Sequence, residues 1–299
     1  MTPFSIFAPA KINLALHVLG RRADGYHDLD SIVAFADVGD ELAITPSAQF
    51  AITASGPFAS DLPSTEDNII ARAWTKMRGL LPDLPHVAVH LTKNLPVASG
   101  IGGGSANAAA AIRAALRLAG IAHVSPEVVA AALSLGADVP VCLLGKACRM
   151  QGVGERMTPL ENFRPLHAVL VNPGIAVSTA DVFRNLGLDK GQHFGTPIGD
   201  SATWRNDLTA PATALAPVIG EVMTALRLSY SSPRARHLPH PAGGEGKVCG
   251  EGKVTPFVGM SGSGATCAGL FPDEAAATAA AATLRHLHLQ WWVVKTLIA

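Results

Sequence analysis

The chain has 299 residues, of which 48% are apolar and 15% are charged, and its 23 Lys and Arg residues balance its 23 Asp and Glu residues. This balance excludes a global field that would favour nucleic acid or an anionic membrane, so any anion must be recognised locally. The length predicts one large or two medium domains, and the apolar fraction suits a well-filled interior.

The N-terminal segment and the cysteines indicate a cytoplasmic protein. Lys11 and Asn13 fall where a signal peptide is most apolar. No run approaches the roughly 20 apolar residues that a membrane span needs. The four cysteines form no C-x-x-C pair, so neither a disulfide framework nor a zinc site is indicated. We therefore expect a reduced cytoplasmic protein without a nucleic-acid or membrane partner.

The first predicted element is a β-strand that begins near residue 8. Apolar side chains alternate with Lys11, Asn13 and His17 along it. Lys11 and Asn13 lie two residues apart and therefore point the same way, which lets both reach one cleft. An ordinary solvent-facing strand would show the same pattern.

A turn at Asp24-Gly25 and a second apolar run from Ile32 to Phe35 predict a hairpin or two consecutive strands. Tyr26 and His27 follow that turn directly, so they are placed either to face a ligand or to form a packed tyrosine beside a solvated histidine. Short strands over 40–57, a helix over about 66–80 and a strand over 87–91 come next.

The stretch Pro96 to Ala110, PVASGIGGGSANAAA, places four glycines in five positions before an alanine-rich helix. Ser105 is a good N-cap, so we expect the helix over Ala106 to Leu118. A glycine loop at a helix N-terminus directs unpaired N–H groups and the positive end of the helix dipole toward one point. That arrangement suits a phosphate, and Lys93 lies at its mouth as either a ligand contact or a loop cation.

The spacing of the glycines excludes two familiar phosphate loops. A Walker A loop needs Lys and then Ser or Thr after its last glycine, but Gly104 is followed by Ser105 and Ala106. A dinucleotide fingerprint counted from Gly100 would need glycine where Ser105 stands. The remaining alternatives are another kind of phosphate loop and a glycine-rich turn that only packs tightly.

Beyond the loop helix, Ser125-Pro126 starts a second helix that Gly136 ends. Asp138 follows at the entry of an apolar segment. An unpaired buried carboxylate is costly, so this one is a cap, an ion-pair partner or a working group.

The C-terminal part contains a series of further elements. It has a strand over 166–172, a helix capped by Ser178 or Thr179, a helix over 210–226, a glycine turn at Met260 to Ala265, a helix capped by Asp273 and a strand over 291–297. Residues 230–256 are rich in Pro, Gly and charge and contain GEGKV twice, which predicts a mobile loop.

Four segments in order resemble the motif set of the GHMP small-molecule kinases. They are PAKINL at 9–14, the glycine loop, GADVP at 136–140 and MSGSGA at 260–265. Within that superfamily, GRRADGYHDL and GIGGGSANAAA are most similar to the branch that phosphorylates the 2-hydroxyl of a cytidine-diphosphate-linked methylerythritol, in the non-mevalonate route to isoprenoid precursors. The resemblance runs from about residue 7 to the C-terminus, except for 230–256.

The resemblance implies roles for individual residues. Asp138 would be the general base and Lys11 would neighbour both it and the transferring phosphoryl group. The nucleotide would be bound by Pro96, Gly100, Gly102, Gly103, Gly104, Ser105, Lys93 and Asn68. The substrate would be bound by Asn13, Tyr26, His27, Thr179 and Phe183, with Tyr26 and Phe183 on the two faces of the cytosine. The turn Ser261 to Gly264 would close the site near the phosphates, and the resemblance identifies no metal ligand.

The resemblance also implies an α+β, two-domain GHMP kinase fold with antiparallel or mixed sheets and an active site in the interdomain cleft. We expect an ATP-binding domain over 1–152, a substrate-side domain over 153–299, use of ATP and Mg²⁺, and a monomer or weak homodimer. Two alternatives stay open. One is another GHMP kinase, of the homoserine or mevalonate type, and the other is a non-catalytic nucleotide-binding relative.

Overall fold

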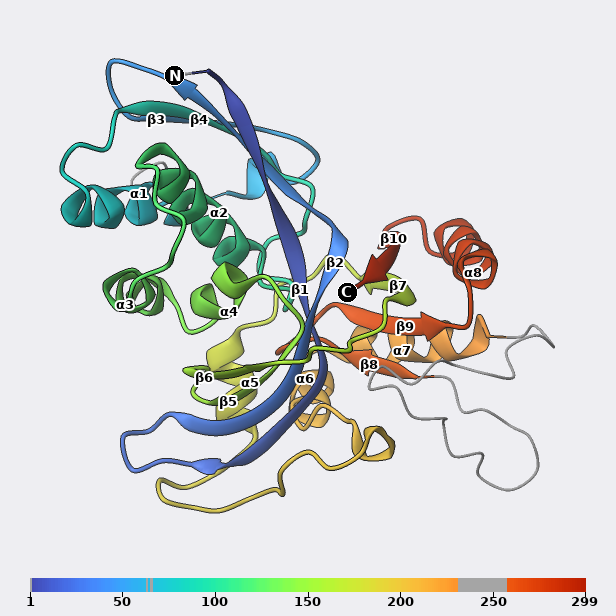
Figure 1. Cartoon of the computed structure of the whole chain (residues 1–299). Helices are drawn as coiled ribbons and strands as arrows, with labels where there is room; N and C mark the ends of the chain where they lie inside the picture. The colour runs from blue at the N-terminus through green and yellow to red at the C-terminus, as the bar shows by residue number, and fades with distance from the viewer. Residues whose placement is uncertain (1, 63, 65–66, 231–256) are drawn as a thin grey trace. The chain divides into compact units, whose positions relative to one another are not determined.

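The computed structural model describes residues 2–62, 64, 67–230 and 257–299 (Figure 1). The predicted mobile loop, from residue 231 onward, and Cys249 lie outside the described residues. Contacts group the chain into two compact units. Unit 1 comprises Met1–Lys11, Val38–Val97 and Gly102–Gly145, and unit 2 comprises Ile12–Asp37, Ala98–Ile101 and Lys146–Ala299.

The units interleave along the chain because the two longest strands pass from one to the other. β1 spans Phe4–Arg21, β2 spans His27–Pro46, and the two strands pair with each other. Each therefore contributes one end to each unit. The expected folding domains, 1–152 and 153–299, and the cleft between them stay predictions.

Unit 1 combines a small sheet with helices. Its elements are β3 (Ala51–Ser55), η1 (Ala59–Asp61), α1 (Ile69–Leu80), β4 (Val87–Thr92), α2 (Gly103–Leu118), α3 (Pro126–Leu135) and α4 (Val139–Leu144). β4 runs parallel to β3 and antiparallel to β2, with Leu91 opposite Leu42. α2 packs on α1 and α4 (Figure 1). Its run of buried alanines allows these helices to approach closely.

Unit 2 has a sheet in the order β2-β10-β7-β9-β8, and β5 pairs with both β2 and β6. Its elements are β5 (Cys148–Gly152), β6 (Arg156–Pro159), β7 (Leu166–Asn172), α5 (Thr179–Asn185), η2 (Ser201–Thr203), α6 (Thr209–Leu215), α7 (Val218–Leu228), β8 (Val258–Met260), β9 (Cys267–Phe271), α8 (Glu274–Leu287) and β10 (Trp292–Ile298). The strand pairs from β10 to β8 are antiparallel. α7 and α8 contact β9, and their apolar faces bury the core there.

Two local predictions were wrong. α2 begins at Gly103 rather than Ala106, because Gly102 adopts a left-handed conformation (φ 64°) and its carbonyl already accepts from Ala106 N–H at 2.8 Å. The predicted helix 210–226 is two helices, since Pro217 interrupts it after Leu215.

The polar side chains of β1 do not face solvent. Lys11, Asn13 and His17 are all buried, which excludes the alternative of an ordinary solvent-facing strand. Buried polar groups need partners, so each of these side chains must be bonded within the fold or serve a ligand.

Among the described residues, no single helix has the length and apolar composition to cross a membrane, although the bent pair Thr209–Leu215 and Val218–Leu228 passes that test jointly.

Candidate active site

Lys11 and Asp138 form an ion pair inside unit 1. Lys11 Nζ lies 2.8 Å from Asp138 Oδ2, and their side chains are 4% and 37% exposed. Asp138 occupies the N-cap position of α4 without making a side-chain cap hydrogen bond. The N-cap interpretation is therefore excluded for its carboxylate, which instead pairs across 127 residues of sequence.

The first turn of α2 lies against that lysine. A Cβ on Gly102 would come within 3.1 Å of Lys11 Cβ, so the left-handed glycine lets the loop cross this side chain closely. The backbone ladder of α2 starts with Ala106 N–H, which leaves the N–H groups of Gly103, Gly104 and Ser105 ahead of it. Gly104 is exposed, and a side chain there would meet nothing within 4 Å. This helix start has the open, positively polarised geometry of an anion site.

Lys93 is not a free cation at the mouth of the loop. It is 2% exposed, and its ammonium donates to Asp40 Oδ2 at 2.7 Å and to Leu95 O at 2.6 Å. Burial lowers the pKa of Lys93, and the charge of Asp40 partly offsets that effect. A Cβ on Gly103 would lie 3.4 Å from Lys93 Nζ, so the Lys93–Asp40 ion pair packs against the start of α2.

Asp40 is a residue that the sequence analysis missed. It is fully buried, and its Oδ1 accepts from the backbone N–H groups of Asn94 and Leu95 at 2.7 and 2.9 Å. Oδ2 also accepts from Asn107 Nδ2 at 3.0 Å, which ties α2 to the turn before the glycine loop. The available signal was the period of the strand, which places Asp40 on the same face as the apolar Leu42 and Ile44.

Two further residues that were predicted to bind the nucleotide, Asn68 and Pro96, have roles in the local structure of unit 1. Asn68 is the N-cap of α1, where its Oδ1 accepts from Ile70 N at 2.9 Å. Pro96 is buried just before the glycine loop.

In unit 2, the loop entry packs on the second glycine turn. Ser261 Oγ donates to Gly100 O and accepts from Asn13 N, both at 3.0 Å. A Cβ on Gly100 would lie 2.5 Å from Ser261 O and 2.6 Å from Gly264 O. Glycine is therefore needed at residue 100 for close approach as well as for its positive φ of 77°.

Two predicted substrate residues border this turn. Asn13 Nδ2 donates to Ser31 Oγ at 2.8 Å, while its buried Oδ1 has no hydrogen-bond partner within the part of the chain described here. Thr179 is exposed at the start of α5, and its Oγ1 lies 2.7 Å from Ser263 Oγ. An acceptor and a hydroxyl group are thus placed beside the 261–264 turn.

The three aromatic residues expected around cytosine do not form a preformed sandwich. His27 stacks on Phe183 with ring centroids 4.5 Å apart and 28° between planes, whereas Tyr26 is 66% exposed. Burial, with a smaller effect of Arg21, lowers the pKa of His27, so its ring is neutral at pH 7. Its buried Nε2 lacks a hydrogen-bond partner among the described residues and is free to bind a ligand.

The described residues contain no group of three or more His, Cys, Asp and Glu side chains that could hold a metal ion. A metal ion in this site would therefore need ligands other than a cluster of three such side chains.

Comparisons with known proteins support the resemblance across the whole chain. The GHMP kinases N terminal domain family matches residues 68–146. The 4-diphosphocytidyl-2-C-methyl-D-erythritol kinase of Dinoroseobacter shibae is 45% identical, with 99% of this chain and 95% of that protein covered. The enzyme of the same name from Methylobacterium radiotolerans is also 45% identical, with both chains fully covered.

A solved structure shares the fold. The crystal structure of 4-(cytidine 5'-diphospho)-2C-methyl-D-erythritol kinase superposes with a TM-score of 0.75 at 31% identity, covering 98% of this chain and 99% of that one. These matches confirm the predicted α+β GHMP kinase fold.

Proposed function

Because the chain belongs to the 4-diphosphocytidyl-2-C-methyl-D-erythritol kinase family, we propose that it transfers the γ-phosphoryl group of ATP to the 2-hydroxyl of 4-diphosphocytidyl-2-C-methyl-D-erythritol. The observation that carries this proposal is full-length similarity to these kinases, together with the Lys11–Asp138 pair against the start of α2. The presence of both a lysine and a partly exposed carboxylate at this point argues against a non-catalytic relative.

The start of α2 would bind the ATP phosphates. The N–H groups of Gly103, Gly104 and Ser105 precede the helix ladder and are oriented as anion donors. The charge of the buried Lys93 is already neutralised by Asp40, so Lys93 would stabilise the position of this turn rather than bind phosphate directly. Gly100, Gly102 and Pro96 would shape the loop, and Asn68 would lie near the nucleotide.

Asp138 would act on the substrate hydroxyl. Lys11 holds its Oδ2, and we assign to Oδ1 the acceptance of the hydroxyl proton as the phosphorus–oxygen bond forms. The Lys11 ammonium would also stabilise negative charge on the transferring phosphoryl group. Phosphoryl transfer depends mainly on such positioning and charge stabilisation, so two side chains and backbone donors suffice.

The cytosine would be recognised by Tyr26, His27 and Phe183. The exposed Tyr26 would move over one face of the base, and the neutral His27 would offer Nε2 for a hydrogen bond. Aromatic contacts of this kind favour a nucleobase over a small aliphatic alcohol. Asn13 and Thr179 would lie along the substrate, because both border the 261–264 turn.

Mg²⁺ would enter bound to ATP. Mg²⁺ usually keeps several waters and binds through phosphates and one or two carboxylates, which agrees with the lack of a metal cluster in the described chain. The ion would neutralise phosphate charge. We further propose a cytoplasmic monomer or weak homodimer.

The test is an ATP-consumption assay that compares the cytidine-linked methylerythritol with homoserine and mevalonate. We expect turnover with the first substrate at least about a hundredfold above that with the other two, since a site built to bind a polar group rejects analogues that lack it. Preference for homoserine or mevalonate would favour the other GHMP kinase types. Nucleotide binding without turnover of any alcohol would favour a non-catalytic relative.

A further inference from the structure

One side chain outside the proposed chemistry makes two hydrogen bonds to the 261–264 turn. Asn206 Nδ2 donates to Met260 O at 2.7 Å and to Gly262 O at 2.8 Å. Its Oδ1 accepts from Leu208 N at 2.9 Å, at the start of α6. A side-chain amide is suited to this position because it offers two donors and an acceptor on one planar group.

The turn that Asn206 holds is in close contact with the entry of the glycine loop. A Cβ on Gly262 would lie 2.6 Å from Gly100 O, and Ser261 Oγ donates to the same carbonyl at 3.0 Å. On its other side, Ser263 contacts Thr179 at 2.7 Å. With so little free space, a shift of the turn must displace Gly100 or break its hydrogen bond.

Asn206 itself is fixed along β1. Leu16 N donates to Arg205 O at 2.8 Å, and Asp207 N donates back to Leu16 O at 2.9 Å. Asp207 Oδ2 accepts from Val18 N, also at 2.9 Å. The residues on both sides of Asn206 are therefore bonded to the strand.

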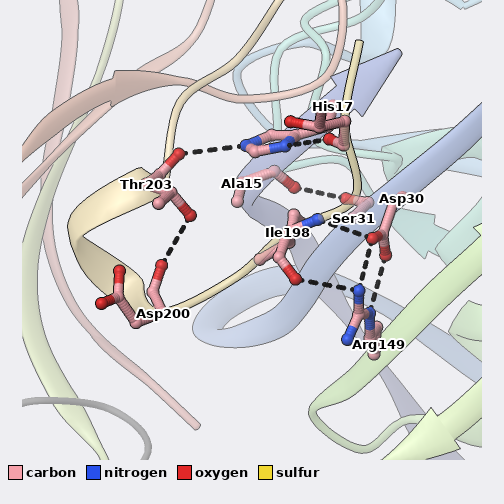
Figure 2. Close-up of polar contacts among 9 residues, drawn as sticks. Ala15, His17, Asp30, Ser31, Arg149, Ile198, Asp200 and Thr203 are labelled. Atoms are coloured by element: carbon pink, nitrogen blue, oxygen red, sulfur yellow. Dashed lines mark hydrogen bonds and ion pairs between the residues drawn. The ribbon is translucent and has the colours of Figure 1, made fainter. Parts of the chain in front are cut away.

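A buried polar cluster anchors the segment that leads to Asn206 (Figure 2). Asp30 is fully buried and accepts from Arg149 Nε and Nη2 at 2.8 and 2.5 Å and from Ile198 N at 2.8 Å. Arg149 Nη2 also donates to Ile198 O at 3.0 Å. The buried His17 ring lies 3.0 and 3.1 Å from two further carbonyl oxygens of this segment. The segment that leads to Asn206 is therefore hydrogen-bonded to the fold at Thr196, Ile198 and Thr203.

We propose that Asn206 is a positioning residue that sets the 261–264 turn and, through Ser261, the loop entry at Gly100. This inference rests on the proposed function, in which Gly100 helps to shape the loop that binds ATP. Asn206 touches no reacting atom in the proposed mechanism. Its contribution is geometric, and a misplacement of about 1 Å can reduce turnover about a hundredfold.

The test uses graded variants and a matched control. Asn206→Ala removes both donors, Asn206→Asp places a carboxylate against two carbonyls, and Asn206→Ser keeps one donor. The control is Tyr230→Phe, since the Tyr230 hydroxyl lies within hydrogen-bond distance of the carbonyls of Phe257 and Leu270, at the other end of the same β8–β9 hairpin. Each protein is assayed for kcat and KM, for thermal midpoint, and for Kd of ATP and of cytidine 5′-diphosphate by calorimetry.

We expect kcat/KM for ATP to fall at least about tenfold in Asn206→Ala, further in Asn206→Asp and less in Asn206→Ser, in the range that loop misplacement produces. The Kd of cytidine 5′-diphosphate should change less than about threefold, because the hydrogen bonds of Asn206 go to Met260, Gly262 and Leu208 and not to the stacked His27 and Phe183. Tyr230→Phe should lower the thermal midpoint while its kinetic constants stay near those of the unaltered protein.

Unchanged kcat/KM for ATP in folded Asn206→Ala would overturn the proposal. Equal losses of affinity for both nucleotides, in step with the thermal midpoint, would also overturn it by showing a general effect on folding. If Asn206→Ala does not fold, the Ser and Asp variants decide by the same criteria. Failure of the proposed function would look different, since the unaltered protein would then not turn over the cytidine-linked alcohol, while the Kd of ATP would still report on Asn206.

Discussion

Replacing Asp138 with Asn keeps the shape of the side chain and removes its capacity to accept a proton as a base. A positioned general base contributes about 10²- to 10⁴-fold to the rate, so we expect kcat to fall by about that factor. This loss corresponds to about 3–5 kcal/mol in the activation free energy. The KM for ATP should change little, because Asp138 precedes α4 and the N–H groups proposed to bind the ATP phosphates are at the start of α2.

The same substitution has a separate cost in stability. Losing one partner of a fully buried ion pair costs about 3–5 kcal/mol. Asp138 is 37% exposed, however, and solvent screening reduces this to about 1–2 kcal/mol. At about 2–4 °C per kcal/mol, the thermal midpoint should fall by about 2–8 °C, which leaves the variant folded at 25 °C.

The assay measures ADP release and the thermal midpoint of the same preparation. Glu274→Gln is the matched control, because it removes a carboxylate that pairs with a lysine on the surface of unit 2. It should leave kcat unchanged. Near-normal turnover in folded Asp138→Asn would refute the assignment of the base.

Three other changes probe the base-recognition residues and two buried ion pairs. Tyr26→Ala should raise the KM for the cytidine substrate about tenfold or more while the KM for ATP stays constant, as loss of an aromatic contact to the base predicts; equal increases would contradict the stacking role. Asp40→Asn should lower the free energy of unfolding by about 3–5 kcal/mol, since it leaves the buried Lys93 unpaired. Adding Lys93→Met to this variant should recover part of the lost free energy, as measured by urea unfolding. The absence of any recovery would argue against the ion pair. Burial alone would raise the pKa of Asp30, but hydrogen bonds and charge from Arg149 hold it below its usual value, so its stabilisation is complete above about pH 4 and is lost as pH falls through the lowered pKa. Unfolding of Asp30→Asn should therefore depend less on pH below about 4 than that of the unaltered protein, and identical pH profiles would contradict this.

Local signals predicted much of the fold. Ser125, Ser178 and Asp273 each cap a helix as expected, because a cap depends on residues two or three positions away. Ser105 failed as a cap because the left-handed Gly102 had already started α2. The pairing of Lys11 with Asp138 was not predictable from local signals. It was expected only because the motifs that contain these residues resemble those of a known family.

The residues that support the site were not predictable in this way. Asp40 bonds to Asn107 across 67 residues, and Asn206 bonds to Met260 across 54. Apart from the Lys93 ammonium, their partners are backbone groups and amides, which carry no periodic pattern in the sequence. These residues and their partners come together only in the folded chain. The catalytic candidates could therefore be identified from the sequence, whereas the supporting residues Asp40 and Asn206 could not.

Phosphoryl transfer to the cytidine-linked alcohol is measured by following the γ-phosphoryl group itself. ATP labelled in that group is incubated with the protein and the cytidine-linked methylerythritol, and the products are analysed by ³¹P NMR and mass spectrometry. We expect the label to move to the substrate as one new phosphomonoester on the 2-hydroxyl, with the diphosphate intact. Release of the label as inorganic phosphate only, or its transfer to another hydroxyl, would contradict the proposed reaction.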